Sequence, residues 1–388
     1  MGDKFYWLWF SFIDDMWSKK MEIFLDVFGS VEEIYKADKD SLMAFLEDYN
    51  QHESNKNILA NNIEEKRIIK GNKVEITLED IGKILDKENG KKKMDDMIKI
   101  MEKEKIRFTY AGDEHFPDRL CDLQSPLYVL FYIGKLPVGR TCSIIGARNC
   151  SEYGKKYALL VGENLAMGNM EVVSGMARGI DTYGMYGAFR NGGNVYAVLG
   201  SGVDICYPKE NFEIYESIKQ RGGIISEYPP GCRPLPWHFP HRNRIISGLS
   251  DCVAVIEARK KSGSLITVAY AHNEGKDIYA LPGRVCDELS VGCNELIRDG
   301  AAVLFDGREI VFDMTGRQIN KRFSKAKLRK ELGTDKYRIY EFLSMTPESV
   351  ENVSINTGIS SEIIRTHLLE MELSGYILEV ASGYYVRA

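Results

Sequence analysis

The sequence predicts a doubly wound α/β fold with a mostly parallel sheet, with a helical region before it and a small helical unit after it. Three observations carry this prediction. Between about residues 105 and 312, short apolar runs alternate with segments of helix length. The runs are rich in Val and Ile and continuously apolar, which is typical of parallel strands buried on both faces. Strand, helix, strand in repetition indicates an open sheet covered by helices.

The region 1–90 is predicted to be an N-terminal helical domain. In "KKMEIFLDVFG" and "DSLMAFLEDY", apolar residues recur at three- and four-residue steps, and Gly29 fits a helix end. The aromatic opening "FYWLWFSFIDDMW" lacks the basic start and cleavage site of a signal peptide, so we expect a helix packed into this domain. The charged stretch "DKENGKKKMDD" is predicted to be a linker or exposed turn.

The sheet domain is assigned to residues 91–312. Its expected strands are "TCSIIG", "EVVSG", "NVYAVLG", "GGIISE", "CVAVIEA", "DIYALPG" and "AAVLF". Helix-length segments such as "EYGKKYALLVGENLAMGN" and "DTYGMYGAFRNGG" separate most of them. This order predicts that the strands share one sheet, with the helices on its faces.

Two further segments complete the chain. Residues 313–330 are basic and polar and are predicted to be a linker. Residues 331–388 are predicted to form three helices followed by the hairpin "YILEVASGYYVRA" with a Ser-Gly turn. Three helices and a β-hairpin are the pattern of a winged-helix domain.

Composition narrows the function classes. The apolar content of 44% and charged content of 28% are those of a globular protein, and the net charge of −5 does not indicate a polyanion partner. No run approaches the ~18 apolar residues of a membrane span. Eight cysteines without C-x-x-C spacing predict buried reduced thiols, no metal site and a cytoplasmic location.

The loops that follow three of the expected strands have the chemistry of anion sites. Each brings glycines and hydroxyls to a strand-to-helix junction, where free backbone N–H groups and the helix dipole attract anions. Because ligands of open α/β sheets bind beyond the carboxyl ends of the strands, we expect these loops to converge. The candidate residues are Gly146 and Arg148 in the first loop, Ser174, Gly175, Arg178 and Gly179 in the second, and Ser262, Gly263, Ser264 and Thr267 in the third.

The segment "FPHRNRIISGLS", residues 239–250, adds charge to this edge. Arg242, Asn243 and Arg244 are strong donors, and arginine is costly to bury without a partner. The window 233–261 holds six basic and two acidic residues in a chain that is acidic overall. Such a patch suits a phosphate backbone, and Phe239 beside it is a candidate platform for an unpaired base. For Trp237, base stacking and core packing remain equally open.

Catalytic patterns are missing from the sequence. The sequence contains no G-x-x-x-x-G-K-[ST], which disfavours nucleotide hydrolysis of the Walker type. The first strand-to-helix turn, "GARNCSEYG", is not G-x-G-x-x-G, which disfavours a dinucleotide cofactor. His238 and His241 lie near the patch, but a catalytic base needs an acid partner that the sequence does not supply. Asp181 and Glu257 are candidate acids, and Glu257 is expected to hold Arg242 or Arg244 in position. We predict neither catalytic residues nor a cofactor.

Taken together, these motifs resemble the DNA-processing protein A family (DprA, or Smf). "GARNCSEYG", "VVSGMARGID", "AVLGSGVDICYPKEN", "ISEYPPG", "FPHRNRIISGLS", "VIEARKKSGSLIT", "LPG" and "GCNELIRDGA" follow in family order over about residues 105–305. The resemblance implies a Rossmann-like central domain, an N-terminal SAM-like domain and a C-terminal winged helix. It also implies a non-enzymatic, homodimeric mediator. Such a protein binds single-stranded DNA through the residues named above, loads RecA onto it, helps RecA displace single-strand-binding protein, and serves natural transformation.

Some positions depart from the family pattern. Gly184 and Met185 stand where an Ala-His pair is common, and "IDDMWSKKM" replaces a Gly-rich hairpin. The expected third helix of the tail, "SSEIIRTHLLEMELSG", holds three Glu and one Arg, which favours contact with protein over contact with DNA.

The alternative function is a nucleotide-cleaving enzyme of the lysine-decarboxylase-like phosphoribohydrolase group. That group carries P-G-G-x-G-T-x-x-E, in which the Glu serves catalysis. The corresponding stretch here is "KSGSLITVAYA", with no Glu three residues after Thr267. A third reading is a recombination scaffold whose winged helix binds a partner.

Overall fold

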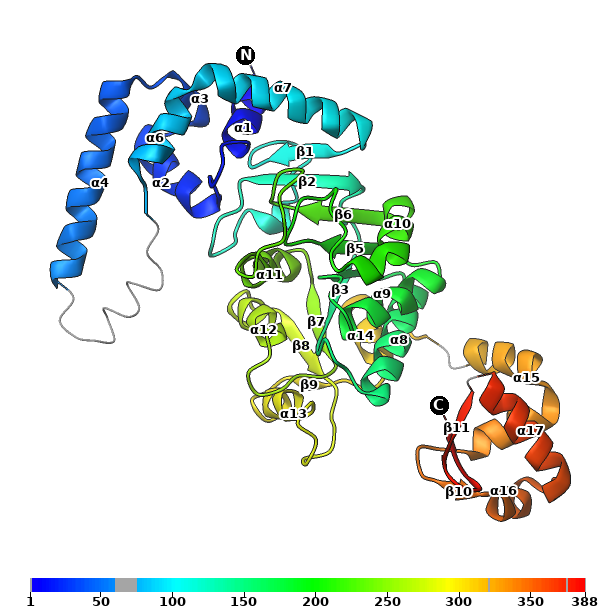
Figure 1. Ribbon diagram of the computed structural model, residues 1–388. Helices are drawn as coiled ribbons and strands as arrows, with labels where there is room; N and C mark the ends of the chain where they lie inside the picture. Colours follow the sequence, from blue (N-terminus) through cyan, green and yellow to red (C-terminus); the bar gives the residue numbers. More distant parts are fainter. Residues whose placement is uncertain (1, 60–74, 320–321, 375, 388) are drawn as a thin grey trace. The chain divides into compact units, whose positions relative to one another are not determined.

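The computed structural model describes residues 2–59, 75–319, 322–374 and 376–387, and the chain divides into two compact units, Met1–Arg317 and Gln318–Ala388 (Figure 1). The first unit contains both the N-terminal helices and the large sheet. The second contains the C-terminal helices and a small sheet. The division of the first unit at residue 90 stays a prediction.

The N-terminal helices pack around an aromatic core. Trp9 and Phe10 are fully buried, so the aromatic opening is a packed helix as predicted. The stretch predicted as a linker, "DKENGKKKMDD", is instead the start of a helix. Met94 and Met101 lie seven residues apart on one face of that helix and are buried, while its lysines face outward. The elements are α1 (Asp3–Ser11), α2 (Ser18–Phe28), α3 (Val31–Lys36), α4 (Lys39–Leu59), α6 (Leu78–Leu85) and α7 (Lys87–Lys103).

The large sheet has nine strands in the order β1-β2-β6-β5-β4-β3-β7-β8-β9. All seven predicted strands are present, and the pairs from β6 to β9 along this order are parallel. Two strands that the sequence did not predict, β1 and β2, extend the sheet in antiparallel fashion beside β6. The strands are β1 (Arg107–Tyr110), β2 (Val129–Gly134), β3 (Thr141–Ile145), β4 (Glu171–Ser174), β5 (Val195–Val198), β6 (Gly222–Ser226), β7 (Cys252–Val255), β8 (Asp277–Ala280) and β9 (Ala302–Val303).

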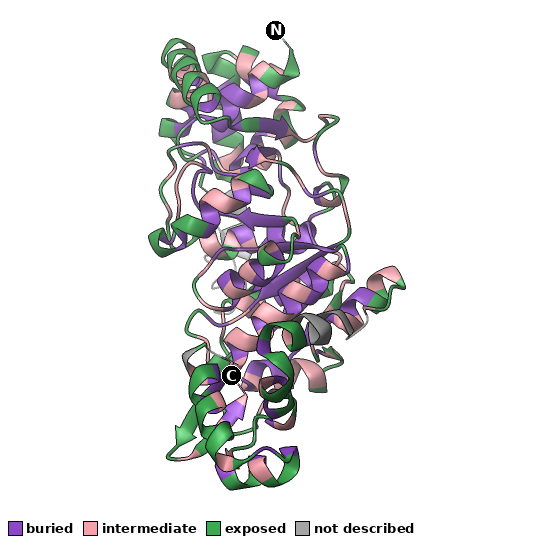
Figure 2. Ribbon diagram, turned by 90° about the vertical axis from the view of Figure 1, so that its right-hand side faces the viewer, coloured by how far each residue is buried: buried purple, intermediate pink, exposed green. Residues whose placement is uncertain are grey.

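Helices cover both faces of this sheet, as expected for a Rossmann-like, doubly wound fold (Figure 1). One face carries α8 (Glu152–Met167), α9 (Ile180–Arg190) and α14 (Arg308–Thr315), and the other carries α11 (His238–Gly248), α12 (Ser264–Asn273) and α13 (Val291–Arg298). Beside β6 lies α10 (Phe212–Gln220), and short 3-10 helices span Asp118–Leu120 and Lys209–Asn211. Figure 2 shows that the sheet is buried between exposed helix surfaces. The chain reverses its winding direction between β3 and β7, which creates a crevice at their carboxyl ends.

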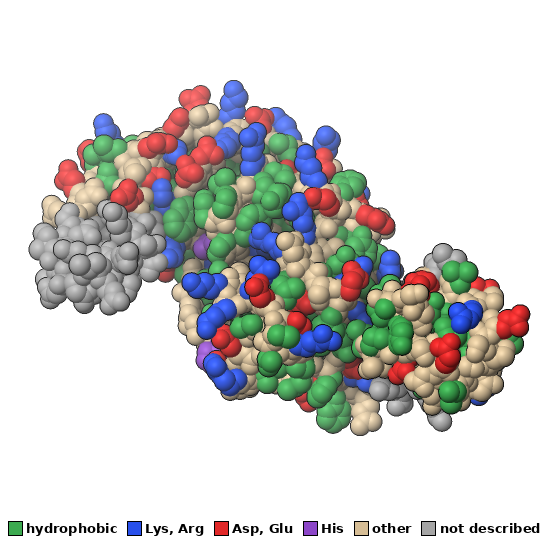
Figure 3. All heavy atoms as spheres, turned by 60° about the horizontal axis from the view of Figure 1, so that its bottom comes forward, with side chains coloured by type: hydrophobic (Ala, Val, Ile, Leu, Met, Phe, Trp, Pro, Cys, Tyr) green, Lys and Arg blue, Asp and Glu red, His purple; other side chains and the backbone are tan. Residues whose placement is uncertain are grey.

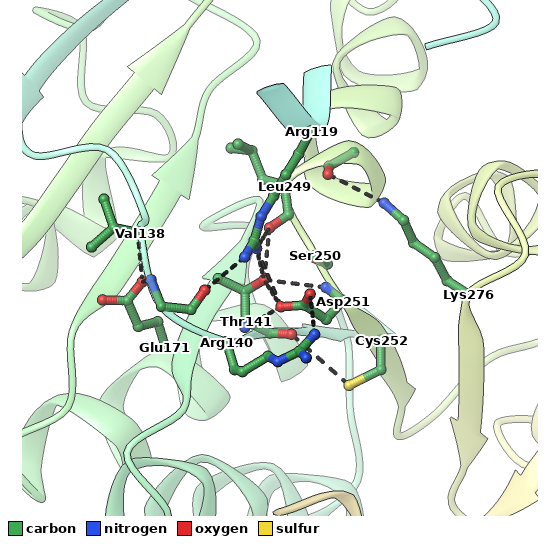
Figure 4. A network of polar contacts seen from close by, with 12 residues as sticks. Arg119, Val138, Arg140, Thr141, Glu171, Leu249, Ser250, Asp251, Cys252 and Lys276 are labelled. Carbon is green, nitrogen blue, oxygen red and sulfur yellow. Dashed lines mark hydrogen bonds and ion pairs between the residues drawn. The ribbon is translucent and has the colours of Figure 1, made fainter. Parts of the chain in front are cut away.

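A polar network fixes the opposite, amino-terminal ends of the strands (Figure 4). The Asp251 carboxylate accepts hydrogen bonds from the Thr141 backbone N–H at 2.7 Å and from the guanidinium groups of Arg119 at 3.2 Å and Arg140 at 3.1 Å. Glu171, at the start of β4, accepts backbone bonds from the chain entering β3. This edge is tied together by its own side chains, whereas the carboxyl edge leaves room for a ligand.

The second unit has its own apolar core, which includes Ile339, Leu343, Val353, Ile364 and Leu368. Its three helices and β-hairpin occur as predicted, with one added short strand that makes a sheet of order β10-β12-β11. The elements are α15 (Arg322–Phe342), β10 (Glu348–Ser349), α16 (Val350–Thr357), α17 (Ser361–Leu373), β11 (Ile377–Ala381) and β12 (Tyr384–Arg387). Much of the predicted linker 313–330 therefore falls on α14 and α15. The winged-helix identity of the unit stays a prediction.

Among the helices that the structure describes, none combines the length and apolarity needed to cross a bilayer.

Candidate nucleic-acid interface

A cavity of about 540 Å³ opens at the carboxyl ends of β3 and β7, at the point where the winding direction reverses. It is bordered by the loops after β3 and β4 and by the first turns of α11 and α12. The predicted residues that line it are Gly146, Arg148, Phe239, Arg242, Asn243, Ser262, Gly263, Ser264 and Thr267. The expectation that separate loops converge on one edge is met for these positions.

One wall of the cavity is aromatic and cationic. The guanidinium carbon of Arg148 lies 5.7 Å from the ring centroid of Phe239, within cation–π range. The ring centroid of Tyr207 lies 5.5 Å from that of Phe239, with the planes inclined at 33°, and Tyr207 is 45% exposed. Tyr207 is not among the predicted residues, although a signal was present: it is an aromatic residue in the loop that follows a predicted strand in "AVLGSGVDICYPKEN".

The facing wall is the start of α12. Ser262 and Ser264 share a hydroxyl–hydroxyl hydrogen bond of 2.8 Å, and the Asn243 side-chain amide donates to the Gly263 carbonyl at 3.3 Å. The first N–H groups of a helix and its dipole attract an anion. An aromatic and cationic wall opposite a helix N-terminus suits a ligand that has both a flat ring and a phosphate.

The start of α8, by contrast, is already occupied by a carboxylate. Glu257 accepts hydrogen bonds from the Ser151 backbone N–H at 2.9 Å and from the Ser151 hydroxyl. A Cβ on Gly154 would come within 2.4 Å of this carboxyl group. The prediction that Glu257 holds Arg242 or Arg244 is therefore wrong. The Glu257 carboxylate instead supplies negative charge at the start of α8.

The loop after β4 supports the cavity from behind. The Ser174 hydroxyl is buried and donates to the Ile144 carbonyl at 2.6 Å. Gly179 has φ +77°, and a Cβ there would lie 2.3 Å from the Ala147 carbonyl oxygen. Neither residue lines the cavity. Both fix the path of the backbone that does.

Gly175 is enclosed between two charged groups. A Cβ at this position would lie 2.7 Å from the Arg242 guanidinium and 2.9 Å from the Asp181 carboxylate. Asp181 accepts a bond from the Gly175 N–H at 3.1 Å, and its burial raises the pKa of its carboxyl group against the opposing effect of Arg242. The absence of a side chain at 175 is what lets these groups approach.

Arg242 serves the scaffold as well as the cavity. It is 4% exposed, and its Nη1 donates to the carbonyls of Gly175, at 3.0 Å, and of Val198. Burial lowers the pKa of its guanidinium to about 10. Its donors thus join the loop that follows β4 to the carboxyl end of β5.

Arg244 points away from the cavity, which corrects the expectation that it contacts the same anion. It is 1% exposed, its Nη2 lies 2.7 Å from a carboxylate oxygen of Glu227, and it donates to the Ser18 hydroxyl at 3.2 Å. His241 Nδ1 lies 3.3 Å from the other Glu227 oxygen. Residues two apart on a helix are turned by ~200°, so Arg242 and Arg244 face opposite sides of α11.

Glu227 is the acid partner of His241 that the sequence did not reveal. Burial alone would raise its pKa. The charges of Arg244 and His241 and hydrogen bonds from His241 and Ser18 outweigh burial and lower it to about 2. The pair is enclosed on the far side of α11, so it has no access to the cavity.

Arg178 lies outside the cavity lining. It is largely exposed, and its Nη2 forms an ion pair of 2.6 Å with Glu210. A phosphate that contacts Arg178 would have to compete with the Glu210 carboxylate for the guanidinium.

His238, in the first turn of α11, is buried and held by the scaffold. His238 Nδ1 lies 2.9 Å from the Gly200 carbonyl oxygen, and burial lowers its pKa, so the neutral ring is favoured. Among the residues that the structure describes, there is no cluster of three or more His, Cys, Asp or Glu side chains that could hold a metal ion.

Comparison with known proteins relates the central part of the chain to a known family. The model of the DNA recombination-mediator protein A family matches residues 107–315. The chain is 41% identical over 201 residues to the DNA processing protein DprA of Streptococcus pneumoniae, an alignment that covers 51% of this chain and 71% of that protein. It is 33% identical over 284 residues to protein Smf of Escherichia coli, covering 71% and 75%.

Two solved structures are similar in fold. DNA processing protein A from Streptococcus pneumoniae matches with a TM-score of 0.51 and 35% identity, over 63% of this chain and 89% of that one. DNA processing protein A from Helicobacter pylori matches with a TM-score of 0.50 and 27% identity, over 55% and 98%. The latter structure describes a single-stranded DNA binding mode of that protein.

Proposed function

The chain belongs to the DNA recombination-mediator protein A family, and from this premise we propose that it binds single-stranded DNA and loads RecA onto it during DNA uptake and natural transformation. The observation that carries the binding role is the cavity at the switch point of the sheet. Its Phe239–Arg148 wall faces the N-terminus of α12 across a space of about 540 Å³. The binding reported for the Helicobacter pylori relative supports the same role.

In the proposed binding mode, one unpaired base stacks on Phe239 and the adjacent phosphate meets the first turn of α12. Arg148 contributes charge to the phosphate side, and Asn243 fixes the loop at Gly263. Stacking of this kind tolerates every base, because each base has a π-face. The protein would therefore bind with little sequence preference.

We further propose that the protein acts without catalysis or a cofactor, as a homodimer in the cytoplasm. RecA and single-strand-binding protein are its proposed protein partners. The acidic, apolar character of the α17 sequence supports protein contact for the second unit. These roles rest on family membership and are tested separately from DNA binding.

The test of DNA binding is a titration of oligo-dT and of duplex DNA at two salt concentrations. We expect tighter binding of the single strand. Arg148→Ala should weaken binding and flatten the salt slope by ~0.7, the value for one single-strand phosphate contact. Arg298→Ala is the matched control, since this exposed arginine ends α13 just before β9, at the opposite edge of the sheet.

Three outcomes would contradict the proposal. Preference for duplex DNA would reject the proposed ligand, and an unchanged salt slope for a folded Arg148→Ala protein would reject the proposed site. Release of free base from a nucleoside monophosphate would reject the non-enzymatic role. Formation of RecA filaments on DNA coated with single-strand-binding protein tests the loading step.

A further inference from the structure

A second aromatic surface lies beside the mouth of the cavity. Trp237 is 49% exposed, which is unusual for a side chain of this size that has a core to join. It stands at the start of α11 between Pro236 and Phe239, both of which line the cavity. The exposed indole is thus continuous along the chain with the proposed stacking wall.

The Trp237 indole packs against a buried ring that is itself fixed. The His238 ring packs against it edge-on, with centroids 4.1 Å apart and planes at 79°. His238 is itself buried, stacked on Tyr228 at 3.9 Å and within 2.9 Å of the Gly200 carbonyl oxygen through Nδ1. A ring supported by a fixed ring loses little conformational entropy when a ligand stacks on it.

Trp17, from the N-terminal helices, extends this surface. Its ring centroid lies 6.0 Å from that of Trp237, with the planes inclined at 56°. Its other ring neighbour is His241, at 6.1 Å and 90°. The two indoles therefore bring the helical region and the sheet region of the first unit together at one aromatic surface.

The charges around the two indoles permit a phosphate backbone. Arg233 is exposed in the loop that leads to Trp237. Asp14 and Asp15 precede Trp17, but each has a lysine partner, Lys93 at 2.6 Å and Lys83 at 3.4 Å. These two acids are thus paired with lysines, Asp204 accepts the Gly231 backbone N–H at 2.9 Å, and the exposed arginine adds positive charge.

We propose that Trp237, flanked by Trp17, is a second base platform that extends the single-stranded DNA path from the cavity toward the N-terminal helices. This inference rests on the proposed function, because the occupant is an unpaired base of the same strand that enters the cavity. The helical region takes part in binding through Trp17, without the Gly-rich hairpin that the sequence lacks.

The experiment compares the binding affinities of two lengths of oligo-dT. One of about 4 nucleotides fits within a single small binding site, and one of about 20 extends beyond it. Trp237→Ala should weaken binding of the long oligonucleotide about 5-fold or more and leave the short one nearly unchanged. Trp237→Phe should keep most of the affinity, because it retains a stacking ring. Phe305→Ala is the control for loss of an exposed aromatic residue elsewhere, since Phe305 is 66% exposed.

Tryptophan fluorescence gives a second measurement that does not depend on an alanine variant. Binding of the long oligonucleotide should quench the wild-type emission, and Trp237→Phe should remove most of the quenching while binding persists. Equal affinities of Trp237→Ala and wild type at both lengths, or an equal loss at both, would overturn the second platform. Absence of wild-type binding at either length would instead overturn the proposed function itself.

Discussion

The buried carboxylate of Glu227 makes a quantitative prediction about stability. Glu227→Gln keeps the volume of the side chain but removes the charge that Arg244 faces at 2.7 Å. The glutamate is 6% exposed and the arginine 1%, so water cannot replace the lost partner. Removing one member of a buried ion pair costs about 3–5 kcal/mol, chiefly because the other charge stays buried alone.

The pKa of Glu227 gives an independent magnitude. Folding lowers it from 4.5 to about 2, which corresponds to ~3 kcal/mol at 1.36 kcal/mol per unit. Because the folded pKa is the lower one, this stability is present above about pH 4.5 and is lost as the pH falls toward 2. The difference between Glu227→Gln and wild type should therefore be largest near neutral pH and shrink in acid.

Urea unfolding followed by circular dichroism at pH 7 and at pH ~3.5 measures both effects. Glu152→Gln is the control, since the Glu152–Lys155 pair is largely exposed and its loss should change the free energy of unfolding by less than ~1 kcal/mol. A Glu227→Leu, Arg244→Met double variant should recover much of the loss. If Glu227→Gln unfolds within ~0.5 kcal/mol of wild type at pH 7, the assignment of Arg244 to a buried scaffold role is refuted.

Three further predictions concern single positions. Glu210→Gln should strengthen single-stranded DNA binding severalfold and steepen its salt dependence, because it frees Arg178 from a 2.6 Å ion pair; unchanged binding would place Arg178 off the DNA path. Gly175→Ala should destabilise the fold by about 1–3 kcal/mol, because the new methyl group meets the Arg242 guanidinium; thermal unfolding measures this, and a neutral result would contradict the packing described. Asp251→Ala should destabilise the first unit by about 2 kcal/mol or more, since it leaves donors at the amino edge of the sheet without an acceptor, while the affinity of the remaining folded protein for oligo-dT should not change.

The parallel part of the sheet could be predicted because two sequence features mark its strands. Each is a continuous apolar run, and most are separated from the next by a segment of helix length. The strand Val129–Gly134 is equally apolar, but it is joined to β3 by a short loop with no helix. It falls outside the repeating pattern, and its antiparallel pairing with β6 depends on residues nearly a hundred positions away.

The charged helix α7 was misread for a different physical reason. Its first turns, "KENGKKK", contain no apolar residue, so the sequence there has the appearance of a solvated turn. The helix is held by Met94, which directly follows this stretch, and by Met101 two turns later, and both are buried. Tertiary packing of a narrow apolar stripe decided the conformation, and a local reading of charge could not detect it.

The charge of the candidate site was overestimated because a count within one window omits partners from elsewhere in the chain. The window 233–261 carries an excess of basic residues, yet Arg244 faces Glu227, Arg259 faces Glu288 and Lys260 faces Glu295, all from outside that window. Figure 3 shows the same mixture on one face of the molecule, where Lys and Arg side chains are interspersed with Asp and Glu. The expected convergence of the Gly and Ser loops was less sensitive to this error, because it follows from strand order alone.

This redistribution of charge changes what should hold a nucleic acid at the cavity. Arg244 is committed to Glu227, and Arg242 donates to two backbone carbonyls, so Arg148 is the arginine at the cavity with its charge available to a phosphate. At ~0.7 per neutralised single-strand phosphate, four arginines would give a salt slope near −3, whereas Arg148 with an occasional contribution from Arg178 gives a slope between about −0.7 and −1.4. Most of the affinity must then come from stacking on Phe239, which salt does not screen, with a smaller, salt-screened contribution from the N–H groups of α12. The two faces of helix α11 have different roles. One face holds the helix against the N-terminal helices through the buried Arg244–Glu227 pair and the Arg244–Ser18 hydrogen bond. The other face presents the Phe239 ring to the cavity from this fixed position.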